Sequence, residues 1–557
     1  MGKLRNLRRG SGLVGLVLAG ALIALPAGHA GAQELTQGLS GQVPQEVTQG
    51  LSMTAYRQAV AENVSGNEGL AAFYRMRDFA PIWTGPDDTA ALRRAALIEA
   101  LGTASVHGLP TQRYDLDGLI RKMRHVEGER ARGELEVEIS RAFLQYAHDL
   151  QSGILNPHDA DSGIKRDAPR RDPKILLEVL AASDPHQVLQ HLAPSSDEYA
   201  RLLRAKLKLE KIVSRGGWGP TVRTAKLELG QRDGDVITLR DRLIAMGYLE
   251  PTLSAEYDDT LRSAVMRFQE SHGLAVDGVA GSSTLSQLNI SAEDRLKSVL
   301  VAMERERWLN LPEGLGKRHI MVNLTDFHAE IVDDGKVTFE TRSVVGSPED
   351  DRRTPEFSDK MDFMVINPSW YVPRSIVVKE YLPLLRNNPG AAGHLEITDR
   401  QGRPVNRANG FSQYTASSFP FAMRQPPGPR NALGTVKFMF PNKYNIYLHD
   451  TPSKSLFDRT QRTFSHGCVR LSDPHDFAYA LLAPQTSDPV RFFQSKLGTG
   501  RETRVNLDQP VPVHLIYRTA FTTVKGEMEY RADVYGRDAR IWDALSAAGV
   551  VLAGGPS

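Results

Sequence analysis

The spacing of apolar residues along this chain of 557 residues changes from helical to alternating close to Gly316. Before that point apolar residues recur at helical intervals, as Ile139 and Phe143 do, four positions apart. After it they alternate with polar residues, as Ile320 and Val322 do. A period near 3.6 predicts amphipathic helices, whereas a period of two predicts strands with one buried face. We therefore expect a helical part followed by a mostly β part.

A chain of this length is longer than a single hydrophobic core normally stabilises, so we expect several domains. Breaks in the pattern, and Pro or Gly clusters, indicate their limits. The predicted fold class is a multidomain one. Its parts are an α-helical scaffold domain over 54–220, a three-helix module over 227–289, a connecting helix over 291–316, a mostly β, β-sandwich-like domain over 317–498 and a C-terminal β extension over 510–557.

Residues 374–429 interrupt the alternating pattern of the β domain and are rich in Pro, Gly, Asn and Gln. An insertion of this length inside a compact domain is usually a lid or a binding loop. We expect a cap over the active site. A surface loop without fixed structure is the alternative.

The first 32 residues have the pattern of an export signal. Four basic residues and no acidic residue occur there, an apolar run spans 13–25, and Ala30-Gly31-Ala32 offers a cleavage site. We expect a signal peptide over 1–32, a linker over 33–53 and a location in the periplasm or cell envelope. An uncleaved membrane anchor is the alternative.

Charge excludes one class of partner. Loss of the four cations of the first 32 residues would change the formal net charge from +2 to −2. A nearly neutral chain offers no electrostatic attraction for nucleic acid, so we expect none as a partner.

Near the end of the segment over 227–289, a turn leads into its third predicted helix. The sequence there is Asp277-Gly278-Val-Ala-Gly281-Ser-Ser-Thr284-Leu285. This stretch resembles the closing D-G-x-x-G-x-x-T-L signature of the peptidoglycan-binding domain family. The resemblance implies contact with the glycan wall. A generic three-helix spacer is the alternative, because a fold by itself does not prove a function.

The chain has a single cysteine, Cys468, with Gly467 before it and the histidines His449 and His466 nearby. A thiol, an imidazole and a flexible backbone are the parts that nucleophilic acyl transfer requires. A buried inert cysteine is one alternative. A structural zinc site is another, but it normally needs four ligands, and there is no second cysteine.

These residues resemble the signature of the L,D-transpeptidase family, whose catalytic domain is of the YkuD type. In the family a histidine is followed, after about fourteen to seventeen residues, by [S/T]-H-G-C-h-N. Here His449 is followed by fifteen residues and then by Ser465-His-Gly-Cys-Val-Arg470. Arg470 stands where many members have Asn, which leaves its role open. Large members with a helical scaffold and a wall-binding module resemble nearly the whole chain.

The resemblance implies a role for each residue of the site. We expect no cofactor, and the ligand count leads us to expect no metal. Cys468 would be the nucleophile and His449 the base. The remaining roles are orienting or oxyanion-binding ones for Asp450, Ser465, His466 and Gly467, and pocket positions for Tyr447, Trp370 and Arg470.

The function that the resemblance implies is the formation of 3→3 cross-links in peptidoglycan, in cell wall biogenesis and cell shape. Cys468 would form a thioester with a donor tetrapeptide stem, and an amine of a second stem would resolve it. Hydrolysis at the same cysteine, as in an L,D-carboxypeptidase, is one alternative. A non-catalytic wall-binding protein is another. Other wall-synthesis enzymes are possible partners, and neither the donor and acceptor preference nor the oligomeric state follows from the sequence.

Overall fold

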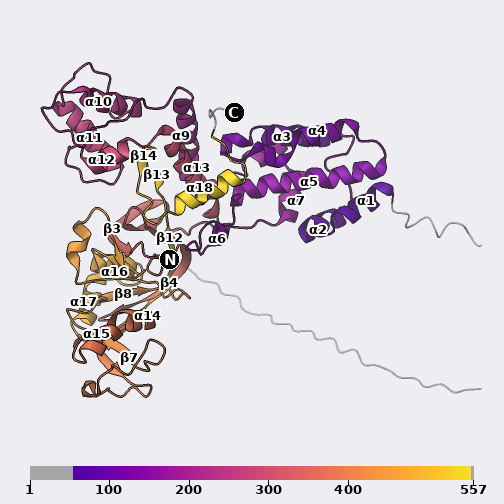
Figure 1. Ribbon diagram of the computed structural model, residues 1–557. Coiled ribbons are helices and arrows are strands. Elements are labelled where there is room, and N and C mark those ends of the chain that lie inside the picture. The colour runs from indigo at the N-terminus through magenta and orange to yellow at the C-terminus, as the bar shows by residue number, and fades with distance from the viewer. Residues whose placement is uncertain (1–53, 553–557) are drawn as a thin grey trace, which may run out of the picture. The chain divides into compact units, whose positions relative to one another are not determined.

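The computed structural model describes residues 54–552 (Figure 1). The expected signal peptide over 1–32 and the expected linker over 33–53 lie outside the described residues. No helix within residues 54–552 is long and apolar enough to cross a membrane.

The scaffold region is helical, as the 3.6-residue period predicts. Its elements are α1 (Ala55–Asn63), α2 (Glu68–Met76), α3 (Asp88–Gly102), η1 (Ala104–His107), η2 (Thr111–Tyr114), α4 (Leu116–His125), α5 (Glu129–Ser152), α6 (Pro157–Ala160), α7 (Pro173–Ala182), α8 (Pro185–Gln190) and α9 (Asp197–Val213). Most of these helices begin after an Asp, Asn, Ser or Thr side chain that accepts a backbone N–H, as Asp87 does from Ala90 at 2.9 Å. The fully buried Glu136 of α5 accepts hydrogen bonds from the N–H groups of Ile82 and Thr84 and so holds the loop before α3.

The small module consists of α10 (Gly234–Met246), α11 (Asp259–Ser271) and α12 (Ser282–Leu288) around one apolar cluster. The helix α10 ends at Gly247, which has φ +88°, a conformation that glycine adopts without strain. The side chain of Gln269 accepts the N–H groups of Asp277 and Gly278 at 3.1 and 2.9 Å and thereby holds the turn before α12. The helical scaffold and the three-helix module are confirmed.

The connecting helix is α13 (Ala292–Trp308), and nearly every residue from Val299 onward is buried. It packs against α9 and α18 (Arg537–Ala547) in one hydrophobic cluster.

The region from residue 318 onward is mostly β, as the alternating pattern predicts. Its strands are β1 (Arg318–Asn323), β2 (His328–Asp333), β3 (Lys336–Gly346), β4 (Phe357–Ile366), β8 (Val436–Met439), β9 (Leu448–His449), β10 (Thr463–Ser465), β11 (Val469–Leu471) and β12 (Thr503–Ile516). They form one sheet in the order β10-β3-β11-β9-β8-β4-β12-β1-β2, and β2 also pairs with β3. Because β2 pairs with β3, the sheet closes on itself. One closed sheet encloses the core, whereas a β-sandwich would have two separate sheets.

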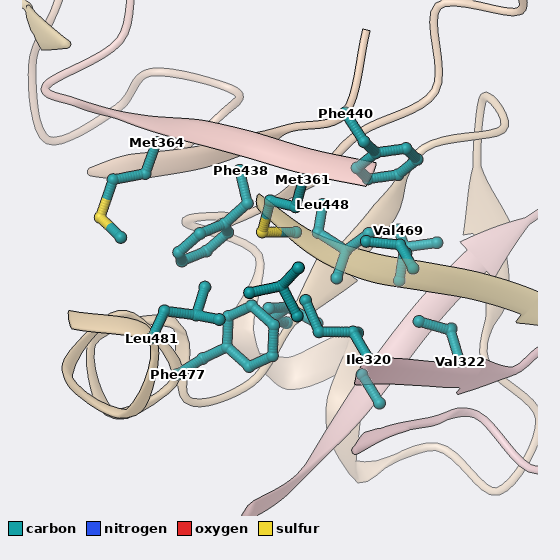
Figure 2. Packing of buried hydrophobic residues seen from close by; sticks show 14 of the residues in the cluster. Ile320, Val322, Met361, Met364, Phe438, Phe440, Leu448, Val469, Phe477 and Leu481 are labelled. Atoms are coloured by element: carbon teal, nitrogen blue, oxygen red, sulfur yellow. The ribbon is translucent and has the colours of Figure 1, made fainter. Parts of the chain in front are cut away.

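Apolar side chains from alternate strand positions fill this core, among them Ile320, Phe438, Leu448 and Val469 (Figure 2). Phe477 and Leu481 of α16 (Pro474–Leu482) pack into the same cluster. The helix α17 (Pro489–Leu497) and the turn η5 (Lys454–Asp458) complete the region.

The C-terminal part differs from the prediction. We expected the catalytic domain to end at 498 and a β extension to span 510–557. Instead β12 lies between β4 and β1 inside the sheet, and only the short hairpin of β13 (Ala520–Thr522) and β14 (Met528–Tyr530) is separate from it. Residues 537–547 form the helix α18, because Ile541 and Leu545, four positions apart, bury one face.

The insertion is a folded subdomain. It contains β5 (Trp370–Tyr371), α14 (Arg374–Ile376), η3 (Val377–Tyr381), α15 (Leu382–Asn387), β6 (Glu396–Thr398), η4 (Arg407–Asn409) and β7 (Ala422–Gln425). The strands pair in the order β5-β7-β6, and the subdomain has its own apolar cluster, which includes Leu385, Ile397 and Phe411. We call this subdomain, residues 370–425, the cap.

Candidate active site

The site lies on the face of the sheet that points away from the core. Along β8, β9 and β11 the residues Phe438, Leu448 and Val469 enter the core. Because successive side chains of a strand point to opposite faces, their neighbours His449 and Arg470 point outward. A cavity of about 960 Å³ on this face is lined by both, by Cys468 and by residues of the cap.

Cys468 directly precedes β11, and its thiol is half-buried. The N–H of Val469 donates to the carbonyl of Tyr447 at 3.1 Å, which sets Cys468 beside Tyr447. The thiol donates to the carbonyl of Asn445 at 3.6 Å. Burial raises the pKa of the Cys468 thiol to about 11, although hydrogen bonding by Tyr447 acts in the opposite direction. The resting form is the thiol.

His449 is buried, and its Nδ1 lies 2.5 Å from the carbonyl oxygen of Asp450. A carbonyl only accepts, so Nδ1 carries the hydrogen and Nε2 has a free lone pair. Burial, and next the charge of Arg470, lower the pKa of His449 to about 3. His449 is therefore neutral at physiological pH, and its free nitrogen can accept a proton.

The Asp450 carboxylate holds its own backbone in place. It accepts hydrogen bonds from Lys454 Nζ at 2.8 Å, from the Thr435 N–H at 2.9 Å and from the Thr451 N–H at 2.7 Å. Burial acts to raise the pKa of this carboxyl, but the bonds from Lys454 and Thr435 outweigh it and keep the pKa below its usual value. The carbonyl that orients His449 is thus fixed by a charged side chain.

Ser465 closes the turn that carries the cysteine. Its hydroxyl donates to the carbonyl of Cys468 at 2.5 Å and accepts the N–H of Gly467 at 3.0 Å. The buried Thr354 donates to the carbonyl of Gly467 at 2.7 Å, and Gly467 has φ +114°. We expected Gly467 to supply an oxyanion donor, but its N–H is taken by Ser465. Among the described residues, the N–H groups of His466 and Cys468 have no acceptor, so they are the available donors.

His466 connects the turn to the cap. Its Nε2 lies 2.6 Å from Oε1 of Glu380 in η3, and the same oxygen accepts from Arg352 at 3.0 Å. A further ion pair joins Lys379 to Asp351. The side chain of His466 thus faces the cap, while His449 is on the sheet.

All three residues that we expected in the substrate pocket line the cavity. The Tyr447 ring centroid is 5.6 Å from that of His449. Trp370 lines the cavity from β5 and packs against the cap cluster, with its ring centroid 6.4 Å from that of Tyr381. Arg470 pairs with His449 in the ladder.

Sequence reasoning missed Lys437, Thr354 and Glu380. Lys437 is a polar residue between the core residues Val436 and Phe438 of β8, an alternation that could have placed it on the outer face. Nothing in the sequence marks Thr354 or Glu380, because only the tertiary fold brings them to the turn. Within residues 54–552 no group of three or more His, Cys, Asp or Glu side chains is placed to hold a metal ion.

Comparison with protein-family models gives three matches. Residues 68–205 match a scaffold domain, residues 232–288 match a "Putative peptidoglycan binding domain", and residues 317–494 match the L,D-transpeptidase catalytic domain YkuD. These matches cover the helical region, the three-helix module and most of the closed sheet.

Individual proteins give further similarity. A "Putative L,D-transpeptidase" of Haemophilus influenzae is 32% identical over 253 residues, which cover 44% of this chain and 50% of that protein. The chain thus spans about half the length of this curated relative.

Two solved structures are also similar. An L,D-transpeptidase of Xylanimonas cellulosilytica shows 16% identity and a TM-score of 0.17, covering 54% of this chain and 98% of that one. One of Stackebrandtia nassauensis shows 15% identity and a TM-score of 0.20, covering 54% and 97%. TM-scores this low carry no argument. On the three family matches, the chain carries the catalytic domain of the L,D-transpeptidase family, joined to a scaffold domain and a peptidoglycan-binding domain.

Proposed function

We propose that this protein is a cysteine-dependent L,D-transpeptidase that forms 3→3 cross-links in peptidoglycan. One observation carries the proposal: a neutral histidine with a fixed tautomer and a thiol lie on the same face of one sheet, in one cavity. A nucleophilic thiol needs a base of this kind nearby.

In the proposed reaction Cys468 Sγ attacks the carbonyl carbon of the third residue, diaminopimelate, of a donor tetrapeptide stem. The thiol proton passes to His449 Nε2 as the carbon–sulfur bond forms. The N–H groups of His466 and Cys468 donate to the oxyanion, and a donor of this kind typically lowers the barrier by about 3 kcal/mol. The bond to the terminal D-Ala then breaks, and its nitrogen takes the proton from His449.

The thioester is resolved by the side-chain amine of a second stem. The amine attacks the same carbonyl carbon, its proton passes to His449, and the thiol of Cys468 is restored as the carbon–sulfur bond breaks. Water in place of the amine would give a tripeptide. The cap, which lines the cavity with Trp370 and Tyr381, is suited to limit the entry of water.

The test is mass spectrometry of the purified protein incubated with a disaccharide-tetrapeptide that contains diaminopimelate. We expect a dimer that has lost one D-Ala, and we expect none from Cys468→Ala. Free tripeptide without dimer would contradict the transpeptidase and establish the hydrolase. Dimer from Cys468→Ala would exclude Cys468 as the nucleophile.

We also propose that the protein works in the periplasm, where the module over 227–289 holds it against the glycan wall. The basic start and apolar run of the first 32 residues support export. Cell fractionation followed by N-terminal sequencing should recover a mature chain that begins at Gln33. Recovery of the full chain in the cytosol would contradict this.

A further inference from the structure

Lys437, His449 and Arg470 form a row across three neighbouring strands. His449 of β9 pairs with Lys437 of β8 in the antiparallel ladder and with Arg470 of β11 in the parallel one. Paired residues of adjacent strands carry their side chains on the same face. All three side chains therefore lie on the outer face, and all three line the cavity that holds Cys468. Two cations thus flank the proposed base.

Neither cation is paired with an anion. Within residues 54–552, no carboxylate forms an ion pair with either of them, and the buried Nε of Arg470 has no hydrogen-bond partner. Burial lowers the pKa of Lys437, and the nearby acidic groups Glu502 and Cys468 act in the opposite direction. The Glu502 carboxylate accepts the N–H of Ser369 at 2.7 Å. Burial of a charge without a partner is costly. Two such cations, one on each side of His449 in the same cavity, indicate a site for an anionic ligand.

We propose that Lys437 and Arg470 bind the terminal carboxylate of the donor stem, which belongs to the amino acid that leaves when Cys468 is acylated. The inference rests on the proposed function and specifies how its donor is recognised. Nothing in the family signature marks Lys437, and Arg470 occupies the position where many members have Asn.

The dimensions of the site favour this carboxylate. Consecutive Cα atoms of a peptide are about 3.8 Å apart, so the terminal carboxylate lies within one residue of the carbonyl that Cys468 attacks. Cys468 and Arg470 are two positions apart on one face, roughly 7 Å along the strand. The long Arg and Lys side chains can span the remaining gap. The side-chain carboxylate of diaminopimelate is at the end of a flexible chain and is not held at a set distance from the reacting carbonyl.

Binding there would also act on the base. Besides burial, the positive charges of Arg470 and Lys437 lower the pKa of His449. A carboxylate held by the two cations offsets their charge and makes His449 a stronger base once the donor is bound. Donor recognition and proton acceptance would then be coupled through the same row of side chains.

The test measures binding to the full chain carrying Cys468→Ala, which needs no reaction. Three tetrapeptide stems are compared by calorimetry: one with both carboxylates free, one with the terminal carboxylate converted to a carboxamide, and one with the diaminopimelate side-chain carboxylate so converted. We expect the terminal carboxamide to bind about 10- to 100-fold more weakly, as the loss of charge-assisted hydrogen bonds predicts. The side-chain amide should bind as well as the free acid.

The same comparison in Lys437→Met should show a weaker preference for the terminal carboxylate. The neighbour Met439, on the same face of β8, indicates that methionine fits there. Lys360→Met, at an exposed position of β4, is the matched control and should keep the full preference. Thermal unfolding of each variant verifies the fold.

Equal affinity for the free acid and the terminal carboxamide would overturn the inference, as would an unchanged preference in Lys437→Met. If only the side-chain amide bound more weakly, the cations would bind the side-chain carboxylate of diaminopimelate. That result would also overturn the inference. Failure of the proposed function would look different, because the stem would then bind with the expected preference while the protein with Cys468 intact formed no acyl enzyme.

Discussion

At the scale of single residues, the proposed nucleophile Cys468 and the proposed base His449 are both uncharged at rest. Burial raises the pKa of Cys468 to about 11 and lowers that of His449 to about 3. Both shifts have the sign that desolvation predicts, because burial disfavours the charged form of each group. In the proposed reaction, proton transfer from the thiol must therefore accompany the attack of sulfur, because the resting thiol is not ionised.

The raised pKa of the Cys468 thiol predicts how the rate of its alkylation depends on pH. Below its pKa a thiol reacts in proportion to its thiolate fraction, which rises about tenfold per pH unit. The rate of Cys468 modification by iodoacetamide, followed by intact mass, should rise through pH 7 to 9 without a plateau. Cysteine in a short unstructured peptide is the control and should begin to level off near pH 9. A plateau for Cys468 below pH 8 would show a thiolate–imidazolium pair instead.

At the scale of elements, the turn between β10 and β11 positions Cys468, the proposed nucleophile. Ser465 bridges the N–H of Gly467 and the carbonyl of Cys468, and Thr354 holds the carbonyl of Gly467. A Cβ atom on Gly467 would lie 3.3 Å from Ile446 Cδ1, and its φ of +114° is strained for any other residue.

Gly467→Ala should therefore reduce acylation of Cys468 strongly, by displacing the turn, at a stability cost of about 1–2 kcal/mol. Acylation is measured by intact mass with the tetrapeptide donor, and stability by denaturant titration. Gly335→Ala is the matched control, because Gly335 also has positive φ, in the turn between β2 and β3, but meets nothing within 4 Å. It should lose similar stability and keep full acylation. Equal acylation in both variants would show that the Gly467 conformation is not needed for the chemistry.

At the scale of the whole molecule, a buried network of charges connects α13, α18 and the residue before β4. Glu356 accepts from Arg305 at 2.6 Å and from Arg537 at 3.1 Å, and Arg305 also contacts Asp538 at 3.2 Å. Glu356 is 2% exposed, so its carboxylate is shielded from water and is held by these two guanidinium groups. The C-terminal helix is thus bound into the molecule through ions as well as apolar contacts.

Glu356→Gln should lower the free energy of unfolding by about 3–5 kcal/mol, because it leaves two buried guanidinium groups without their shared anion. Denaturant titration monitored by circular dichroism measures this. Glu138→Gln breaks the exposed pair with Lys122 and should cost less than about 1 kcal/mol. Similar losses in the two variants would mean that the buried network contributes no more than a surface pair.

Several features of this protein follow from local sequence patterns. The change of apolar period separates helical from β regions, and the capping residues and Gly247 mark helix ends, because each of these depends on neighbours within a few positions. The motif around Cys468 likewise predicts the nucleophile and the base that we propose, since both belong to one short stretch. The sequence also predicts the strand within 510–517, but it does not predict that this strand lies in the middle of the sheet.

What the sequence alone determined is thus the type of most elements and the candidates for the reactive groups, which local periodicity and short motifs encode. Only the tertiary structure decided that Gly467 donates to Ser465, that Glu380 of the cap meets His466, and that Lys437 stands beside His449. These contacts depend on strand register and on the folding of a distant insertion. The alternation within one strand predicts which face each residue occupies. It does not predict which distant strand will pair with it, and these contacts depend on that pairing.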